Sequence, residues 1–283
     1  MGAEGARVPV VNALTVDVED YFHAEALASA APRERWDHMP SRVVASTERV
    51  LELFERHGVH GTFFVLGWVA RRHPEVVRRI ADAGHEVACH GMTHRLIYRQ
   101  SRETFREETR ASRALLQELS NQPVDGYRAA SFSITRASLW ALEEIASAGL
   151  HDTYGIPGAP TSPYRIPTAG GELIEVPLST VTVGGVRLPA SGGGYYRLLP
   201  EVLGRFLLDR VNAEGRPFVF YMHPWEIDPD QPRQTLPLRS RLRHYTNLGR
   251  FEARLDRLLA RYAFDRMDRL LERRPEIIEY KSE

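Results

Sequence analysis

The chain repeats one pattern, in which a short apolar run is followed by a longer amphipathic segment. The apolar runs have the length of buried strands, and the segments between them carry apolar residues at helical spacing. Strands that alternate with helices form βα units around a parallel sheet, so we expect an α/β fold. The expected strands cover residues 13–18, 61–67, 86–90, 173–179 and 217–224, and the expected helices cover 41–58, 73–85, 101–119, 136–149, 200–215 and 245–264.

The number of expected strands, about six or seven once the segment around Arg128 is included, favours a (β/α) barrel over two smaller domains. The barrel need not be complete. No internal repeat occurs, and no Gly/Ser-rich or Pro-rich linker is long enough to separate two domains. We therefore expect a single catalytic domain over residues 1–283.

Composition excludes several classes of partner. Lys+Arg and Asp+Glu number 37 each, so the net charge predicts neither a nucleic-acid partner nor a membrane-surface role. The N-terminus lacks the pattern of a signal peptide and no window approaches a membrane span, so we expect a cytoplasmic protein without an integral membrane segment. The single cysteine, Cys89, allows no intrachain disulfide, and its apolar setting favours a buried strand residue over a ligand or nucleophile.

Charged and imidazole side chains follow the ends of four expected strands. In a (β/α) barrel the carboxyl ends of the strands meet at one face, so these side chains are expected to lie together. Along the first strand, side-chain alternation puts Asp17 and Glu19 on one face and Asp20 on the other. The remaining members are His90, His94, Arg128, His223, Trp225, Glu226 and Asp228.

Each of these groups, taken alone, also fits a structural role. A histidine pair occurs on solvated helix faces, and the run DVED can cap a helix. Arg128 fits a surface ion pair, and His223 fits a core histidine whose hydrogen bonds are satisfied. Their occurrence at four strand ends favours a shared functional site, because the structural roles leave that coincidence unexplained.

The residue types indicate a metal site. Two neutral imidazoles and one carboxylate form a three-ligand site with open positions, as in catalytic zinc sites. The i, i+4 spacing of His90 and His94 predicts one helical turn that directs both rings to the same side. A divalent ion in such a site polarises a carbonyl and activates water. Asp17 is then the candidate base, and His223 the candidate acid for an amine that leaves an amide.

These residues, in this order, resemble the polysaccharide deacetylase superfamily, carbohydrate esterase family 4. TVDVED is similar to its first motif, HGMTH (90–94) to its second, RAASF (128–132) to its third and FYMHP (220–224) to its fifth. The resemblance covers about residues 13–228, with a C-terminal extension from about residue 229. The stretches STVTVGGVRLPASGGGYYRLLP and HPWEIDPDQP resemble the subfamily found in exopolysaccharide loci associated with exosortase sorting systems, which implies a role in exopolysaccharide biosynthesis.

The resemblance implies a distorted, incomplete (β/α) barrel of about seven parallel strands, one divalent metal ion and hydrolysis of an N-acetyl group on an amino sugar. It makes Asp17 the general base and His223 the general acid, with Arg128 holding the catalytic carboxylate. The backbone N–H near Ser131 would stabilise the oxyanion. The implied metal ligands are Glu19, His90 and His94. Zinc is the expected ion, although this ligand set also admits cobalt, nickel or iron.

Three positions depart from the family pattern. The family has a second Asp as ligand, whereas Glu19 stands at the face-matched position here and Asp20 remains an alternative. Gly91 stands where many members carry Ser or Thr, as in the branch that includes intracellular amidohydrolases. Ala130 replaces a Pro of the third motif, which removes a fixed φ beside the oxyanion donor and is expected to lower activity.

The glycines of PASGGGYYRLLP, Gly192 to Gly194, permit close approach of the backbone to a ligand. We expect a loop at the mouth of the site, with Tyr195 and Tyr196 stacking on a sugar ring. The alternative is a surface loop with core tyrosines. Trp225 is a second candidate for sugar contact, and a buried core position is the alternative for it.

Three functions are consistent with these features. The leading hypothesis is a metal-dependent deacetylase that acts on N-acetylated amino sugars of a polysaccharide or its lipid-linked precursor. The second is a metal amidase for a small linear or cyclic amide, which needs an enclosed pocket instead of an open groove. The third is a carbohydrate-binding barrel without activity, although Asp17, both histidines and His223 are all present.

Overall fold

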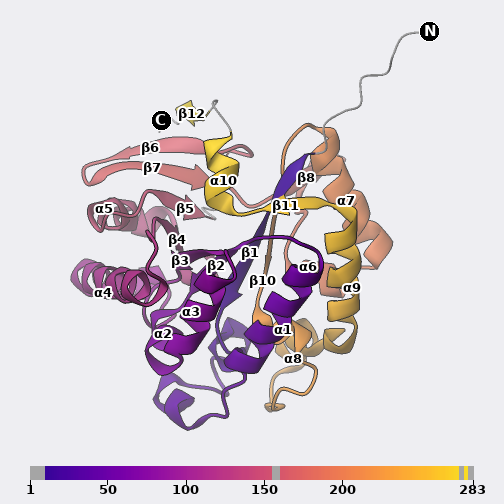
Figure 1. The fold of residues 1–283 in the computed structure, drawn as a ribbon, viewed down its shortest axis with the longest axis horizontal. Coiled ribbons are helices and arrows are strands. Elements are labelled where there is room, and N and C mark those ends of the chain that lie inside the picture. Colours follow the sequence, from indigo (N-terminus) through magenta and orange to yellow (C-terminus); the bar gives the residue numbers. More distant parts are fainter. Residues whose placement is uncertain (1–9, 155–159, 274–276, 280–283) are drawn as a thin grey trace.

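The computed structural model describes residues 10–154, 160–273 and 277–279. Helices flank a central curved sheet, with α2, α3 and α4 on one side of Figure 1 and α7 and α9 on the other. The strands are β1 (Val11–Val18), β2 (Thr62–Val65), β3 (Glu86–Cys89), β4 (Gly126–Arg128), β5 (Asp152–Tyr154), β6 (Tyr164–Thr168), β7 (Gly171–Val176), β8 (Thr180–Val183), β9 (Val186–Pro189), β10 (Val219–Met222), β11 (Ala263–Asp265) and β12 (Ile278–Glu279).

Ten α-helices occur in the described part of the chain, together with seven short 3₁₀ helices. The α-helices are α1 (Val43–Arg56), α2 (Gly67–Arg72), α3 (Pro74–Asp82), α4 (Arg102–Ser120), α5 (Trp140–Ser147), α6 (Gly193–Leu198), α7 (Glu201–Ala213), α8 (Leu238–Tyr245), α9 (Leu248–Arg261) and α10 (Met267–Glu272). The 3₁₀ helices are η1 (Tyr21–His23), η2 (Glu25–Leu27), η3 (Arg33–His38), η4 (Ile97–Arg99), η5 (Ala130–Phe132), η6 (Arg136–Ser138) and η7 (Pro224–Ile227).

The main sheet has the strand order β10-β1-β2-β3-β4-β5-β7-β6-β12. The strands from β10 to β7 in this order run parallel, which confirms the expected α/β fold with about seven parallel strands. β6 joins β7 as an antiparallel hairpin. The barrel is incomplete, because no pairing joins β10 to β12 in the part of the chain that the structure describes.

The two sides of β1 face different surroundings. Its even-numbered residues from Leu14 to Val18 pack into the main apolar cluster, which includes residues of α1 and α3. Ala13 instead packs with Phe64 of β2 and Ala88 of β3. Because side chains alternate along a strand, Asp17 lies on the same side as Ala13. The site is therefore built on the side of the sheet that faces away from α1 and α3.

Several elements differ from the sequence expectations. The last expected helix ends at Arg261, and residues 263–265 pair with β1 as β11. The partner of β7 was missed because β6 carries Pro167 and lies near the sheet edge, where proline is tolerated. The small hairpin of β8 and β9, together with α2, α6, α8 and α10, was not expected. Cys89 is fully buried in β3, as predicted.

An ion-pair cluster joins α4 to α5. The buried carboxylate of Glu144 accepts hydrogen bonds from Arg102 and from Arg106, whose side chains are partly exposed. The hydrogen bonds from Arg106 lower the pKa of Glu144 to about 2; burial opposes this shift and Arg102 adds to it. A carboxyl group whose pKa is lower in the folded chain stabilises the fold above its unfolded pKa and loses that contribution as the pH falls.

We expect Glu144→Gln to reduce the free energy of unfolding near neutral pH. The difference from the wild type should shrink as the pH falls from about 4.5 towards about 2, because the wild-type carboxylate is then protonated. Urea unfolding at several pH values measures this difference in the free energy of unfolding. Glu103→Gln, an exposed neighbour on α4, should change little. A Glu144→Gln difference that stays constant across this pH range would contradict the assignment.

Candidate active site

Four parallel strands deliver polar side chains to one edge of the sheet. Their carboxyl ends lie together, as βα folds require. Asp17 lies on β1, and Arg128 ends β4. A cavity of about 580 Å³ opens at this edge. Of the six residues for which the sequence predicts a catalytic or metal-binding role, five line this cavity, namely Asp17, Glu19, His90, His94 and His223.

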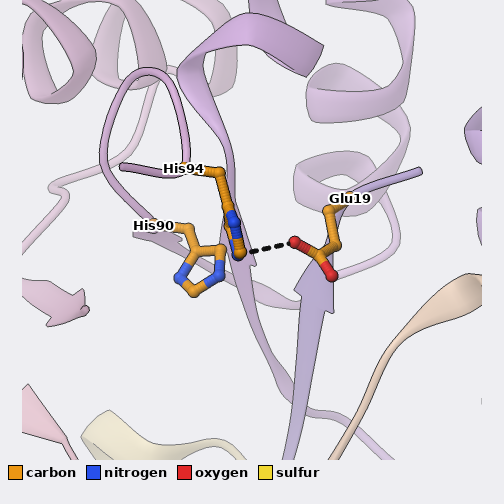
Figure 2. A group of neighbouring side chains, drawn as sticks. All are labelled: Glu19, His90 and His94. Atoms are coloured by element: carbon orange, nitrogen blue, oxygen red, sulfur yellow. Dashed lines mark ion pairs between the residues drawn. The ribbon is translucent and has the colours of Figure 1, made fainter. Parts of the chain in front are cut away.

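Glu19, His90 and His94 form a buried cluster. Figure 2 shows the three side chains converging from the end of β1 and from the loop after β3. Each offers one ligand atom within 4.8 Å of the other two. Glu19 Oε2 lies 2.8 Å from His94 Nε2, and the two imidazole rings are 5.3 Å apart. The three side chains are the donor set that a divalent ion requires.

The protonation of His90 suits a ligand. Its Nδ1 lies 2.8 Å from the carbonyl oxygen of Arg128, which only accepts, so Nδ1 carries the hydrogen and Nε2 keeps its lone pair. Burial lowers the pKa of His90 to about 4, so the ring is neutral at neutral pH. A backbone carbonyl that orients a ligand imidazole in this way is common around protein metal ions.

Glu19 is held as a carboxylate. Burial favours the neutral acid, but the electrostatic interaction and hydrogen bond with His94, with His223 and His90 nearby, bring the pKa of Glu19 below its ordinary range. Trp225 Nε1 donates to Glu19 Oε1 at 3.4 Å. An ionised, buried carboxylate beside two imidazoles fits a divalent cation, because buried charge needs a partner of opposite sign.

The expected helical turn between His90 and His94 is wrong. Residues 90 to 94 form a loop in which Gly91 and His94 both have positive φ, at 76° and 51°. The backbone N–H groups of Gly67 and Trp68 at the start of α2 donate to the carbonyl oxygens of Gly91 and Met92. This anchored loop, and not a helix, brings the two rings together. The left-handed conformation also suits glycine at position 91.

Asp20 lies outside the cluster. Its carboxylate accepts hydrogen bonds from Ser41 Oγ at 2.6 Å and from the backbone N–H groups of Arg42 and Val43. These contacts cap the start of α1, where orphan N–H groups need acceptors. The structure thus places Glu19 with the histidines and gives the alternative ligand, Asp20, a structural role.

Arg128 holds Asp17. Its NH1 donates to Asp17 Oδ1 at 2.5 Å, its NH2 donates to Thr15 Oγ1 at 3.0 Å, and its guanidinium carbon lies 4.0 Å from the ring centroid of Phe64. Arg128 is completely buried. Asp17 Oδ2 is directed elsewhere and lies 3.9 Å from His223 Nε2. One carboxylate oxygen is therefore fixed while the other faces the cavity.

His223 has a carboxylate partner, Glu226, to which the sequence pattern assigns no role. Its Nδ1 lies 3.2 Å from Glu226 Oε2, and Arg197 Nε donates to Glu226 Oε1 at 2.8 Å. Burial would lower the pKa of His223, but the hydrogen bond to Glu226 and the charges of Glu19 and Asp17 raise it to about 9. The ring is therefore protonated at neutral pH, with Nε2 towards Asp17 and Glu19.

Arg197 and Glu226 were missed as a pair because they lie 29 residues apart and meet only in the fold. The HPWE spacing was the available signal, since it puts His223 and Glu226 at i, i+3 in a capping box at η7. Gly193 also matters here, because a Cβ on it would lie 2.2 Å from Glu226 Oε2. The glycine stretch thus allows close approach to a buried carboxylate.

The stretch expected to be a loop forms helix α6 from Gly193 to Leu198, and its two tyrosines lie in different surroundings. Tyr195 is 44% exposed and lines the cavity, whereas Tyr196 is buried in the core against Phe220. Trp225 lines the cavity but is nearly buried, stacked between His223 and His244. Ser131 lies at the cavity wall in η5, with φ at 50°.

Another hollow of similar volume lies away from this site. A hollow of about 570 Å³ between α1 and α3 has a lining that includes none of the six predicted residues. Within the described residues, every helix is too short or too polar to cross a bilayer.

We expect Glu19→Gln to weaken binding of Zn²⁺ by at least about a hundredfold, since it removes a charged ligand candidate. Asp20→Asn should keep the affinity and lose about 1–3 kcal/mol of stability with its cap contacts. Competition with a chromophoric chelator measures the affinity, and urea unfolding measures the stability. Loss of binding in Asp20→Asn with full binding in Glu19→Gln would reverse the assignment.

Comparison with known proteins divides the chain into two overlapping matches. Residues 35–150 match the family model for polysaccharide deacetylase, and residues 145–272 match a domain of unknown function, DUF3473. The first match contains His90, His94 and Arg128, and the second contains His223. Asp17 and Glu19 lie before both matches.

Curated relatives match over short stretches. A chitooligosaccharide deacetylase of Rhizobium leguminosarum bv. trifolii is 50% identical over 48 residues, which are 17% of this chain and 22% of that protein. A peptidoglycan-N-acetylglucosamine deacetylase of Bacillus cereus is 28% identical over 99 residues, 35% of this chain and 36% of that protein. The matches thus span only about a fifth to a third of these relatives.

Solved structures agree over nearly the whole chain. A Mycobacterium smegmatis structure, provisionally assigned as a polysaccharide deacetylase, has a TM-score of 0.67 at 21% identity and covers 97% of this chain and 96% of its own. Puue allantoinase has a TM-score of 0.61 at 14% identity, with 93% and 89% coverage. At these identities the likeness concerns the fold. Over residues 35–150 the chain is thus similar in sequence to polysaccharide deacetylases, and it shares their fold.

Proposed function

We propose that this protein is a metal-dependent hydrolase that removes N-acetyl groups from amino-sugar units of a polysaccharide or its lipid-linked precursor. One observation carries the proposal: a buried Glu19, His90 and His94 cluster lies beside Asp17 and His223 in one cavity. The relatives named as deacetylases of chitooligosaccharides and peptidoglycan support an acetylated amino sugar as substrate.

Glu19, His90 and His94 would hold the ion, which we expect to be zinc. When bound, a divalent ion supplies Lewis-acid polarisation of the amide carbonyl and acidifies a nearby water. The residues fit this role because the carboxylate is ionised, His90 is neutral and all three are buried.

Asp17 is the proposed general base. Arg128 occupies Oδ1, which leaves Oδ2 to take a proton from the attacking water. The fixed guanidinium keeps the carboxylate oriented throughout, so no reorganisation is needed when the charge changes. The water oxygen joins the acetyl carbon, and the C–N bond to the sugar then breaks to give acetate and an amine.

His223 is the proposed general acid. Its Nε2 faces the cavity and carries the proton that the leaving nitrogen needs, while Glu226 holds Nδ1. An acid opposite the base is what amide cleavage requires, because an amine anion does not leave. The backbone N–H near Ser131 is the proposed second oxyanion donor.

We also propose a pathway, a domain extent and a location for the protein. The DUF3473 match covers the stretches that resemble the exosortase-associated subfamily, and the proposed role in exopolysaccharide biosynthesis rests on that resemblance. A single catalytic domain over residues 1–283, with its extension from about residue 229, is supported by one sheet that joins strands from both family matches. A cytoplasmic location remains a prediction from the sequence.

A small amide is the second candidate substrate. Gly91 favours it, as does a cavity whose volume falls within the ~300–1,000 Å³ of small-molecule pockets. Acetate release from acetylated amino-sugar oligomers, measured beside hydrolysis of small linear and cyclic amides, distinguishes the two. We expect acetate release that a chelator stops and added Zn²⁺ restores. Turnover of amides alone would favour the second candidate, and activity that resists full metal removal would contradict metal dependence.

We expect Asp17→Asn to lower kcat by about a thousandfold or more while metal content stays near the wild-type value, because general-base catalysis is lost and the ligand cluster remains. Initial rates of acetate release and metal analysis of the same sample measure both. Asp37→Asn, at an exposed ion pair with Arg72, is the matched control and should keep full activity. Retained turnover in Asp17→Asn would remove Asp17 from the mechanism.

A further inference from the structure

The segment from residue 231 to residue 251 is basic, although the whole chain is neutral. It contains five arginines and neither Asp nor Glu. The nearest acidic residues along the chain are Asp230 and Glu252. Because 37 basic and 37 acidic residues balance overall, this absence marks a local excess of positive charge. Most of the segment's arginines lie on or beside α8.

The charges and two leucines on α8 point to solvent. Arg239, Arg241 and Arg243 are exposed and form no ion pair with any residue that the structure describes. Leu238 and Leu242, one turn apart, are 59% and 54% exposed. We call these five residues, 238, 239 and 241 to 243, the α8 face. A large apolar side chain that is half exposed gains little from folding, so this face has the composition of a binding surface.

α8 is fixed to the catalytic apparatus. His244 and Tyr245 at its end are buried, and His244 Nε2 lies 2.7 Å from Gln231 Oε1. Arg197 donates to the carbonyl oxygens of His244 at 3.1 Å and Thr246 at 2.7 Å. The same guanidinium holds Glu226, the partner of His223. The helix therefore keeps one orientation relative to the site.

The α8 face adjoins the mouth of the cavity. Arg243 and His244 line the cavity together with Tyr195 and Leu198 of α6, which are each 44% exposed. α8 packs against η2 and α6, which also contribute to the cavity wall. Figure 1 places α8 in the lower part of the molecule, away from the end of the sheet where β1 begins. A surface that contacts the α8 face thus lies next to the cavity opening.

We propose that the α8 face docks on a lipid bilayer whose headgroups carry net negative charge, with the cavity mouth turned to that surface. Leucines enter the boundary between headgroups and acyl chains, while arginines beside them contact anionic headgroups. A free acidic polysaccharide would use the arginines but leave the leucines in water. A second copy that applied the same face would bring like charges together.

Co-sedimentation with vesicles tests this proposal without any assay of catalysis, so it stands or falls separately from the proposed function. Wild-type protein is mixed with phosphatidylcholine vesicles, alone or with roughly one third phosphatidylglycerol. We expect binding to the anionic vesicles that weakens with salt. Arg239→Gln/Arg241→Gln should weaken binding to the anionic vesicles by roughly fivefold per arginine. Leu238→Ser/Leu242→Ser should weaken the vesicle binding that persists at high salt.

Matched controls lie elsewhere on the surface. Arg71→Gln/Arg78→Gln removes two exposed arginines of α2 and α3, and Val186→Ser removes an apolar side chain that is 59% exposed; both should bind as the wild type does. Absence of binding by the wild type, or equal loss in the control variants, overturns the proposal. A concentration-dependent dimer that the leucine variant abolishes, without vesicle binding, would assign the face to a second copy. Thermal melts of each variant verify the fold.

Discussion

The ion pair between Arg128 and Asp17 is the interaction on which the rest of the site depends. Both side chains are buried, so removing either partner would leave a buried charge without its nearest counter-charge. The pair also joins β1 to β4, which are separated by β2 and β3 in the sheet. The carbonyl of Arg128 in turn orients His90, so one residue fixes the base and a ligand candidate together. An apolar side chain at this position could make neither contact with Asp17 nor any other ion pair.

Acidic side chains alternate with histidine and arginine side chains across the cavity beside this pair. Glu19 lies between His94 and His223, and Glu226 lies between His223 and Arg197. Each carboxylate therefore has cationic or polar neighbours on two sides, which keeps it ionised in spite of burial. The proposed acid, protonated His223, and the proposed base, Asp17, therefore lie beside one another in the same cavity. Amide hydrolysis requires both an acid and a base within reach of the substrate.

Local sequence patterns predicted the architecture and most residues of the candidate site. The reason is that the carboxyl ends of parallel strands lie at one edge of the sheet, so residues that follow the strands come together. Asp17, Glu19, His90 and His223 each follow an apolar run, and that placement sufficed to expect them together. The patterns failed where backbone geometry depends on distant contacts. The loop from His90 to His94 is held by backbone N–H groups of α2. The i, i+4 spacing of the two histidines is also that of a helical turn, so the sequence alone could not distinguish the two. The role of Arg197 was hidden because its partners come from distant segments.

Net charge does not describe local charge, for a related reason. A sum over the whole chain predicts no affinity for an anionic surface, yet electrostatic attraction is set by charges within about a Debye length, roughly 8–10 Å. Many of the chain's arginines pair with carboxylates nearby, as Arg42 does with Asp228, and their fields cancel at short range. The arginines of α8 lack such partners among the described residues, so their field extends into solvent. Where unpaired arginines lie beside exposed leucines, the local arrangement of charge, and not the net charge of the chain, determines which surface that part of the protein can bind.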